Sequence, residues 1–138
     1  FYGLMTDDKK VIFKIDGRVS DGSYGFHVIM VTGQTYTQSD YEGNFIFNVI
    51  RNGAPRPGWA YGEAAIDNTG LGRYISYTDS AGGGPTPATF IRAISGSGVI
   101  TDPADATTHG QMSYNKDIVV RTNTNAYGRY GMIIGFKR

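Results

Sequence analysis

Turn-forming residues punctuate the whole chain and cut it into short apolar or alternating runs. Twenty of the 138 residues are glycine, and aromatic residues make up 13% of the chain. Glycine costs about 1 kcal/mol at a helical position, and aromatic side chains favour strands. Short runs separated by such turns are typical of all-β sandwiches and barrels. We therefore expect almost no helix.

The runs that qualify as strands cover residues 10–15, 24–32, 44–51, 59–65, 73–78, 89–95, 117–122 and 131–138. This number of strands suits two packed sheets or a closed barrel. The prediction is a single all-β domain over residues 1–138, an antiparallel β-sandwich or short barrel of about eight strands. Residues 81–87 and 101–111 are expected to be loops, with one helical turn behind Asp102 as an alternative for the second.

Two of the predicted strands are apolar on both faces. In residues 24–32, Phe26 and Val28 alternate with Ile29 and Val31, and residues 44–51 follow the same pattern. Alternate side chains of a strand point to opposite faces, and an antiparallel sheet normally leaves one face to water. Both faces of these strands therefore need cover, which either a neighbouring subunit or the chain's own loops would supply.

Composition argues against several classes of function. Cysteine is absent, which removes thiol catalysis and thiolate metal sites. The net charge is +1, and the scattered Lys and Arg form no cationic stripe of the kind that nucleic-acid binding requires. No apolar stretch approaches the roughly 20 residues of a membrane span. We expect no nucleic-acid partner, no membrane insertion, no metal and no cofactor.

Acidic residues offer one candidate for catalysis. Asp40 and Glu42 flank Tyr41, and Glu63 lies in a predicted strand. A glycosidase uses two carboxyl groups held about 5 to 10 Å apart, and these residues could supply such a pair. Charges at turns and strand edges are the more common role for isolated acids of this kind.

Tyrosine-rich loops are the better candidate for binding. The residues predicted to form a shallow, non-catalytic ligand site are Tyr36, Tyr41, Asn125, Tyr127 and Arg129. Tyrosine supplies contact area at low entropic cost, arginine a planar fork of donors, and asparagine both donors and acceptors. The single tryptophan, Trp59, lies in a predicted strand and is expected in the core.

Four segments follow one another in a suggestive order: Phe13-Lys14-Ile15, the glycine-punctuated strand 25–33, the tyrosine-bearing segment 41–51, and the strand 131–138. In this order the chain resembles the distal receptor-binding domains of bacteriophage tail fibres and tailspikes. The resemblance rests on a pattern without an invariant motif, and it covers about the first half of the chain and its last strand.

The resemblance implies a β-sandwich head at the outward-facing tip of a virion's tail fibre, assembled as a homotrimer. Its partner would be a bacterial surface polysaccharide or another host receptor, and the chain would be the C-terminal part of a longer fibre protein. No catalytic residue of the family has a matching motif here. Two alternatives stay open: a carbohydrate-processing tailspike domain that uses Asp40 or Glu42 with Glu63, and a purely structural trimerisation domain.

Overall fold

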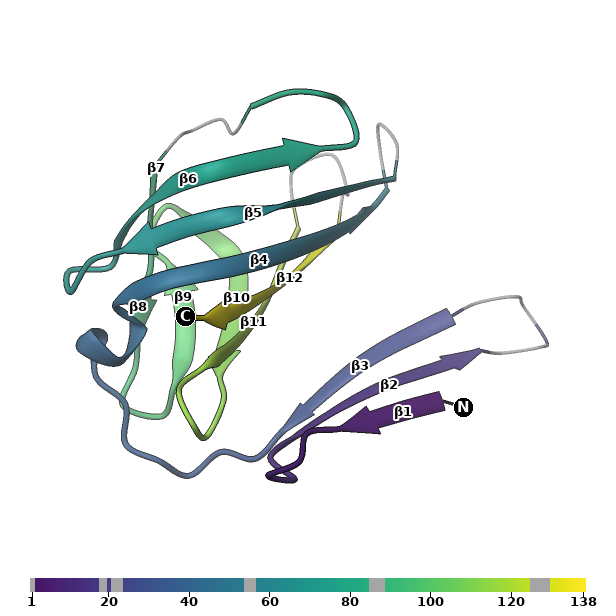
Figure 1. Ribbon diagram of the computed structural model, residues 1–138, viewed down its shortest axis with the longest axis horizontal. Helices are drawn as coiled ribbons and strands as arrows, with labels where there is room; N and C mark the ends of the chain where they lie inside the picture. The colour runs from purple at the N-terminus through teal and green to yellow at the C-terminus, as the bar shows by residue number, and fades with distance from the viewer. Residues whose placement is uncertain (1, 18–19, 21–23, 54–56, 85–88, 125–129) are drawn as a thin grey trace.

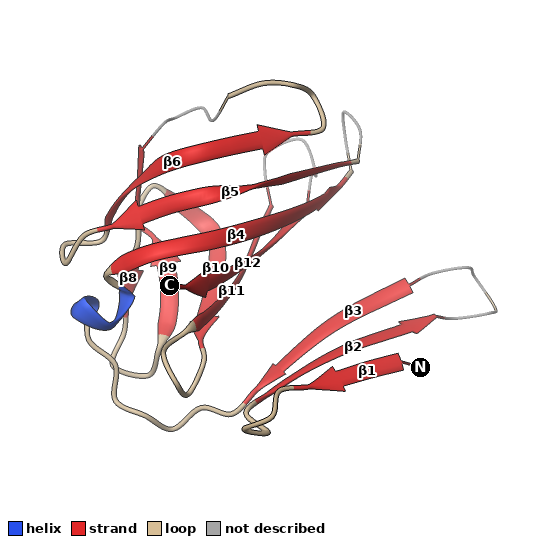
Figure 2. Cartoon of the chain, in the orientation of Figure 1, coloured by secondary structure: helices blue, strands red, loops and turns tan. Residues whose placement is uncertain are grey.

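The computed structural model describes residues 2–17, 20, 24–53, 57–84, 89–124 and 130–138. These residues form strands, turns and one short 3-10 helix, η1 (Gln38–Tyr41), as Figure 2 shows. Every strand pairing is antiparallel, which confirms the all-β prediction. Over the same residues, no helix has the length and apolar character needed to cross a membrane.

The first three strands form a small sheet of their own. They are β1 (Tyr2–Met5), β2 (Val11–Gly17) and β3 (Tyr24–Met30), paired in the order β1-β2-β3. Figure 1 shows this sheet projecting away from the rest of the chain. At its base, Val11 is buried and the Lys10 ammonium lies 4.2 Å from the centre of the Tyr114 ring. A hydrogen bond from Asn115 to Asp8 joins the same two regions.

The remaining strands form a nine-stranded sheet in the order β7-β6-β5-β4-β12-β11-β10-β9-β8. They are β4 (Gly43–Asn52), β5 (Gly58–Ile66), β6 (Leu71–Asp79), β7 (Thr89–Ile91), β8 (Ala93–Ile94), β9 (Val99–Asp102), β10 (Asp105–Met112), β11 (Ile118–Thr124) and β12 (Tyr130–Lys137). Figure 1 shows the sheet curling into an open trough that resembles an incomplete barrel. The ladder shifts register between Glu63 and Ala64 and between Asp105 and His109, and such irregularities bend strands.

The hydrophobic core lies inside the curl. Its main cluster of buried residues comprises Tyr36, Tyr41, Phe45, Ile66, Ile100, Met112 and Val119. The Tyr41 and Phe45 rings meet edge to face with their centres 5.5 Å apart. Tyr41 is the last residue of η1 and Phe45 lies near the start of β4, so this cluster fills one end of the trough.

Small residues keep the other part of the trough open. The inward positions of β12 include Gly131 and Gly135, and β5 presents Ala60, Gly62 and Ala64. A side chain at Gly62 would collide with the Ser76 carbonyl, since its Cβ would lie 2.2 Å from that oxygen. The large aromatic side chains of β4 and β6 extend over these glycine and alanine residues. A hollow therefore remains along the inner face of β12.

Three strands lie outside the predicted set: β1, β9 and β10. The prediction of a loop over residues 101–111 is wrong for most of that segment. Its tight turn uses Asp102, whose carboxylate accepts the Ala104 N–H at 2.8 Å, and neither Pro103 nor Ala104 begins a helical turn. The β-branched Thr107 and Thr108 then favour an extended strand, which pairs with β11 from His109 onwards.

Candidate functional site

A cavity of about 130 Å³ opens on the concave side of the nine-stranded sheet. It follows β4 from Phe45 to Arg51, and β6, β11 and β12 supply most of its other walls. The Phe45 end is closed by the main core cluster. At the Arg51 end, Arg51 of β4 faces Gly131 of β12, and Gly131 in turn faces Asn123 of β11. The cavity is therefore a recess with an apolar floor and polar groups near one end.

Four aromatic rings form one wall of the cavity. Tyr74 is central: its ring centre lies 5.4 Å from Phe47, 5.6 Å from Tyr77 and 5.2 Å from Phe90. The edge-to-face and tilted geometries are those that aromatic pairs prefer. Because these rings stand on paired strands and hold one another, the wall is rigid.

Three arginines, Arg51, Arg92 and Arg121, also line the cavity. Arg51 Nη2 donates a hydrogen bond of 3.1 Å to the Tyr77 hydroxyl, which in turn donates to Asp79 at 3.4 Å. Burial raises the pKa of Tyr74, while the positive charges of the three arginines oppose that rise. All three guanidinium groups thus lie close enough to influence one phenol.

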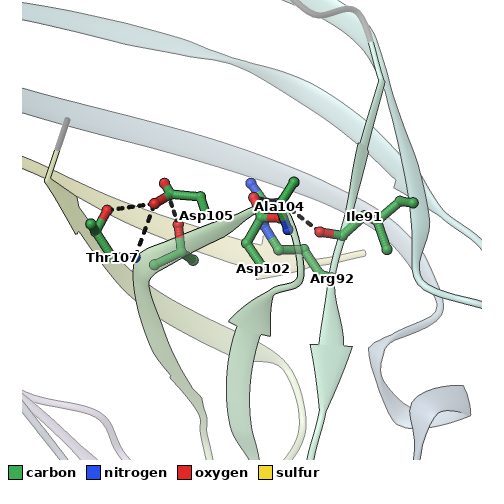
Figure 3. A network of polar contacts seen from close by, with 7 residues as sticks. Ile91, Arg92, Asp102, Ala104, Asp105 and Thr107 are labelled. Atoms are coloured by element: carbon green, nitrogen blue, oxygen red, sulfur yellow. Dashed lines mark hydrogen bonds and ion pairs between the residues drawn. The ribbon is translucent and has the colours of Figure 1, made fainter. Parts of the chain in front are cut away.

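Arg92 is largely enclosed, with its side chain 11% exposed. It lies between β7 and β8, at the point where the predicted strand 89–95 is interrupted. Its Nη1 donates to the Ile91 carbonyl at 2.6 Å and forms an ion pair with Asp102, as Figure 3 shows. Its Nε is buried and has no hydrogen-bond partner among the described residues. Burial is the main cause of a lowered Arg92 pKa, and the charge of Arg121 lowers it further.

Arg121 comes from β11 and faces Gly110 of β10 across the ladder. No hydrogen bond or ion pair joins the Arg121 guanidinium to any carboxylate within the described part of the chain. Among the described lining residues there is also no Asp or Glu. The cavity therefore carries a surplus of positive charge.

The tyrosines predicted as ligand contacts in the first loop have a different role. Tyr36 and Tyr41 are 3% and 2% exposed, and both belong to the main core cluster. The Tyr36 hydroxyl donates to the Ser113 carbonyl at 3.1 Å, and burial raises the Tyr36 pKa. Neither ring lies at the outer surface, because the curled sheet closes around the loop that carries them, but Tyr41 lines the inner end of the cavity.

The other predicted contacts, Asn125, Tyr127 and Arg129, lie outside the described residues. The strands that this segment joins are β11 and β12, and the adjoining Asn123 lines the cavity. Of the two predicted residues that the structure describes, Tyr41 lines the cavity and Tyr36 does not.

Trp59 is not in the core, contrary to expectation. It is 48% exposed on the convex face of the sheet, where its ring stacks on Tyr61 at 5.8 Å with an interplanar angle of 17°. Register places Trp59 opposite the exposed Ile50. The inward positions of β5 hold alanine and glycine beneath bulky neighbours, so the strand turns its large rings outward.

The acidic residues considered for catalysis lie outside the cavity lining. Burial raises the pKa of Asp40, but hydrogen bonds from Lys116 and Thr37 outweigh it and leave the pKa below its usual value. Glu63 pairs with Arg138 at 3.0 Å. A general acid needs a raised pKa, so the environment of Asp40 disfavours that role. The described residues also hold no cluster of three His, Asp or Glu that could bind a metal ion.

Apart from Tyr41, the described cavity residues were not identified from the sequence, although a signal was present. Phe45, Phe47 and Val49 form one face of β4, and that apolar face ends in Arg51. Val119 is followed on the same face of β11 by Arg121 and Asn123. A polar residue at the end of an apolar face marks the mouth of a trough, but only the strand pairing shows that these positions meet.

No protein-family model and no curated protein sequence matches this chain.

Proposed function

We propose that this protein is a non-catalytic binding domain for a bacterial surface glycan, at the tip of a phage tail fibre. The observation that carries the proposal is the recess on the concave face, where aromatic rings and arginines converge on rigid strands. Binding pockets are typically apolar recesses with a few fixed polar groups. The C–H faces of a sugar ring pack on aromatic walls, while arginine and asparagine donors bond its oxygens.

The absence of carboxylates from the described cavity lining supports binding without turnover. Hydrolysis of a glycosidic bond normally uses two carboxyl groups that flank the bond. Asp40 and Glu63 are already engaged with Lys116 and Arg138. A sugar held in the recess would therefore meet hydrogen-bond donors and no described acid.

The test is an array of purified bacterial polysaccharides probed with the full chain. We expect retention of the protein on at least one of them, without release of reducing ends. Retention on none, or steady release of reducing ends, would contradict the proposal.

Two neighbouring positions on β11 provide a matched pair of variants. Asn123→Trp places a bulky ring in the cavity, whereas Thr122→Trp places the same ring on the opposite, exposed face of the strand. We expect only Asn123→Trp to abolish retention, and both variants to keep the circular dichroism spectrum of the parent. Equal retention by the two variants would exclude the recess as the site.

The proposal includes assembly into a homotrimer, which uncovered apolar surface supports. One face of the small sheet is built entirely from apolar and aromatic side chains; we name it the apolar face. Its members are Tyr2, Leu4, Val11, Phe13, Ile15, Phe26, Val28 and Met30, of which Val11 is already buried at the base of the sheet and Tyr2, Leu4 and Ile15 are exposed. Isolated small sheets are marginally stable in water, and large exposed apolar patches mark interfaces.

The convex face of the large sheet offers a complementary surface. Its exposed apolar side chains include Ile50, Trp59, Tyr61, Ile75 and Tyr130. Contact between the apolar face of one copy and the convex face of the next is heterologous, and a rotation that closes such contacts produces a ring. Three copies would present three glycan sites to one cell surface, which raises the overall avidity.

A further inference from the structure

We infer that the ligand of the concave recess carries an anionic group, a carboxylate or a phosphate, and that Arg51, Arg92 and Arg121 surround it. The inference rests on the proposed function for the sugar and on the recess's own charges for the anion. A neutral sugar would need donors and acceptors in comparable numbers, whereas this recess is rich in cationic donors.

The charge balance of the recess is the first support. Three guanidinium groups line it, and of these only Arg92 forms a described ion pair, with Asp102. Arg51 bonds the neutral hydroxyl of Tyr77, and Arg121 has no described carboxylate partner. Like charges held together in a partly enclosed space repel one another, and a bound anion relieves that repulsion.

The burial of Arg92 is the second support. Its side chain is only 11% exposed, and its Nε is buried with no hydrogen-bond partner in the described part of the chain. A buried N–H without a partner costs free energy that a bound acceptor would recover. Asp102 and the Ile91 carbonyl hold the guanidinium from one side through Nη1, which fixes its position.

The way that Arg121 is accommodated is the third support. Gly110 leaves room for the Arg121 stem, since a Cβ at Gly110 would lie only 2.4 Å from Arg121 Cγ. Arginine offers planar pairs of donors that match carboxylate and phosphate oxygens. The aromatic wall of Phe47, Tyr74 and Tyr77 then remains for the ring that bears the anion.

The test compares four small probes by NMR titration of the full chain: sodium glucuronate, its methyl ester, glucose 6-phosphate and inorganic phosphate. We expect glucuronate or glucose 6-phosphate to bind at least about tenfold more tightly than the ester, as a charged hydrogen bond implies. Binding should weaken as salt is raised, because salt screens charge. Which of the two sugars binds more tightly identifies carboxylate or phosphate as the group.

Arg121→Gln is the decisive variant, and Arg73→Gln is its matched control because Arg73 is exposed and does not line the recess. We expect the first to weaken anion binding about tenfold and the second to leave it unchanged. Arg121→Lys should recover part of the affinity. Equal losses in the two Gln variants would overturn the inference.

The outcomes separate this inference from the proposed function. Equal affinity for glucuronate, glucose 6-phosphate and the methyl ester would overturn the anionic ligand and leave glycan binding intact. Binding of inorganic phosphate that depends on Arg121, without retention on any polysaccharide, would support the anion site and contradict the glycan function. Absence of binding by all four probes would overturn the inference.

Discussion

Gly110 faces Arg121 across the β10–β11 ladder, so closely that a Cβ on the glycine would lie 2.4 Å from Arg121 Cγ and 2.8 Å from the Val120 carbonyl oxygen. The second contact is with backbone, which cannot rotate away. The glycine therefore determines both the spacing of two strands and the position of a cationic side chain in the recess.

Gly110→Ala is expected to lower the free energy of unfolding by about 1 to 3 kcal/mol, the usual cost of overpacking. It should also weaken anion binding, because Arg121 must shift. Urea unfolding and NMR titration measure the two effects. Gly96→Ala is the control, since a Cβ at Gly96 would meet nothing within 4 Å. Identical unfolding curves for the two variants would contradict the steric role of Gly110.

Asp102 neutralises a guanidinium that has little access to water. The side chains of Arg92 and Asp102 are 11% and 12% exposed. Asp102→Leu leaves Arg92 without its carboxylate partner, and we expect a loss of roughly 3 kcal/mol in the free energy of unfolding. The double variant Arg92→Met, Asp102→Leu should recover most of that loss, because no unpaired charge remains. A double variant that is less stable than Asp102→Leu would contradict this account.

Asp105 makes stability sensitive to acid. Its carboxylate accepts 2.6 Å and 2.9 Å hydrogen bonds from the hydroxyl and the N–H of Thr107, as Figure 3 shows, and these bonds lower its pKa. A lowered folded-state pKa means that the stabilisation is fully present above the ordinary carboxyl pKa. It is lost as the pH falls through the lowered value.

Asp105→Asn should therefore reduce the melting temperature at neutral pH, and the difference from the parent should shrink in strong acid. Thermal unfolding of both proteins, between neutral and strongly acidic pH, measures this difference in melting temperature. A difference that stays constant over this range would show that the carboxylate charge contributes nothing. Glu42→Gln is a suitable control, since it removes one exposed carboxylate elsewhere.

The fold class and most strands could be predicted because alternation and turn residues are local signals. Arg92 illustrates the limit of such signals: the run 89–95 has uniform strand character, but it is interrupted at Arg92, whose backbone N–H donates to the Gly70 carbonyl at 2.9 Å. The strand β10 was missed because its inward positions include Thr108 and Gly110, so the apolar alternation is weak. Its partner strand β11 supplies the apolar residues that the local pattern of β10 lacks.

The candidate site was predicted poorly for a related reason. Tyr36 and Tyr41 have polar neighbours in the sequence, which suggests exposure, but the sheet curls over them. Trp59 has a strand-like context that suggests burial, but the small inward residues of β5 turn it outward. In both cases the packing of residues distant in sequence decides burial, and periodicity does not contain that information.

Tyr36→Phe tests the structural role assigned to that residue. It removes the buried hydrogen bond to the Ser113 carbonyl, and we expect the free energy of unfolding to fall by about 1 kcal/mol. Glycan retention should be unchanged, because Tyr36 does not line the recess. Loss of retention at unchanged stability would return Tyr36 to the ligand site.

The apolar face of the small sheet yields the last prediction. Leu4 is 78% exposed on the edge strand β1, and none of the described side chains on that face is charged. If identical copies cover the apolar face, Leu4→Asp buries an unpaired charge in the assembly but leaves the single chain with a solvated carboxylate. We expect the parent to sediment as a trimer and the variant as a folded monomer with the parent's circular dichroism spectrum.

Ile29→Asp is the matched control, because Ile29 is 54% exposed on the opposite face of the same sheet, beside the polar Lys14 and His27. Dissociation by Leu4→Asp alone would assign the contact to the apolar face, and dissociation by both would mean that the assembly covers both faces. A parent chain that sediments as a monomer at micromolar concentration would contradict the trimer itself. That result would leave the glycan recess untouched, since its described walls come from one chain.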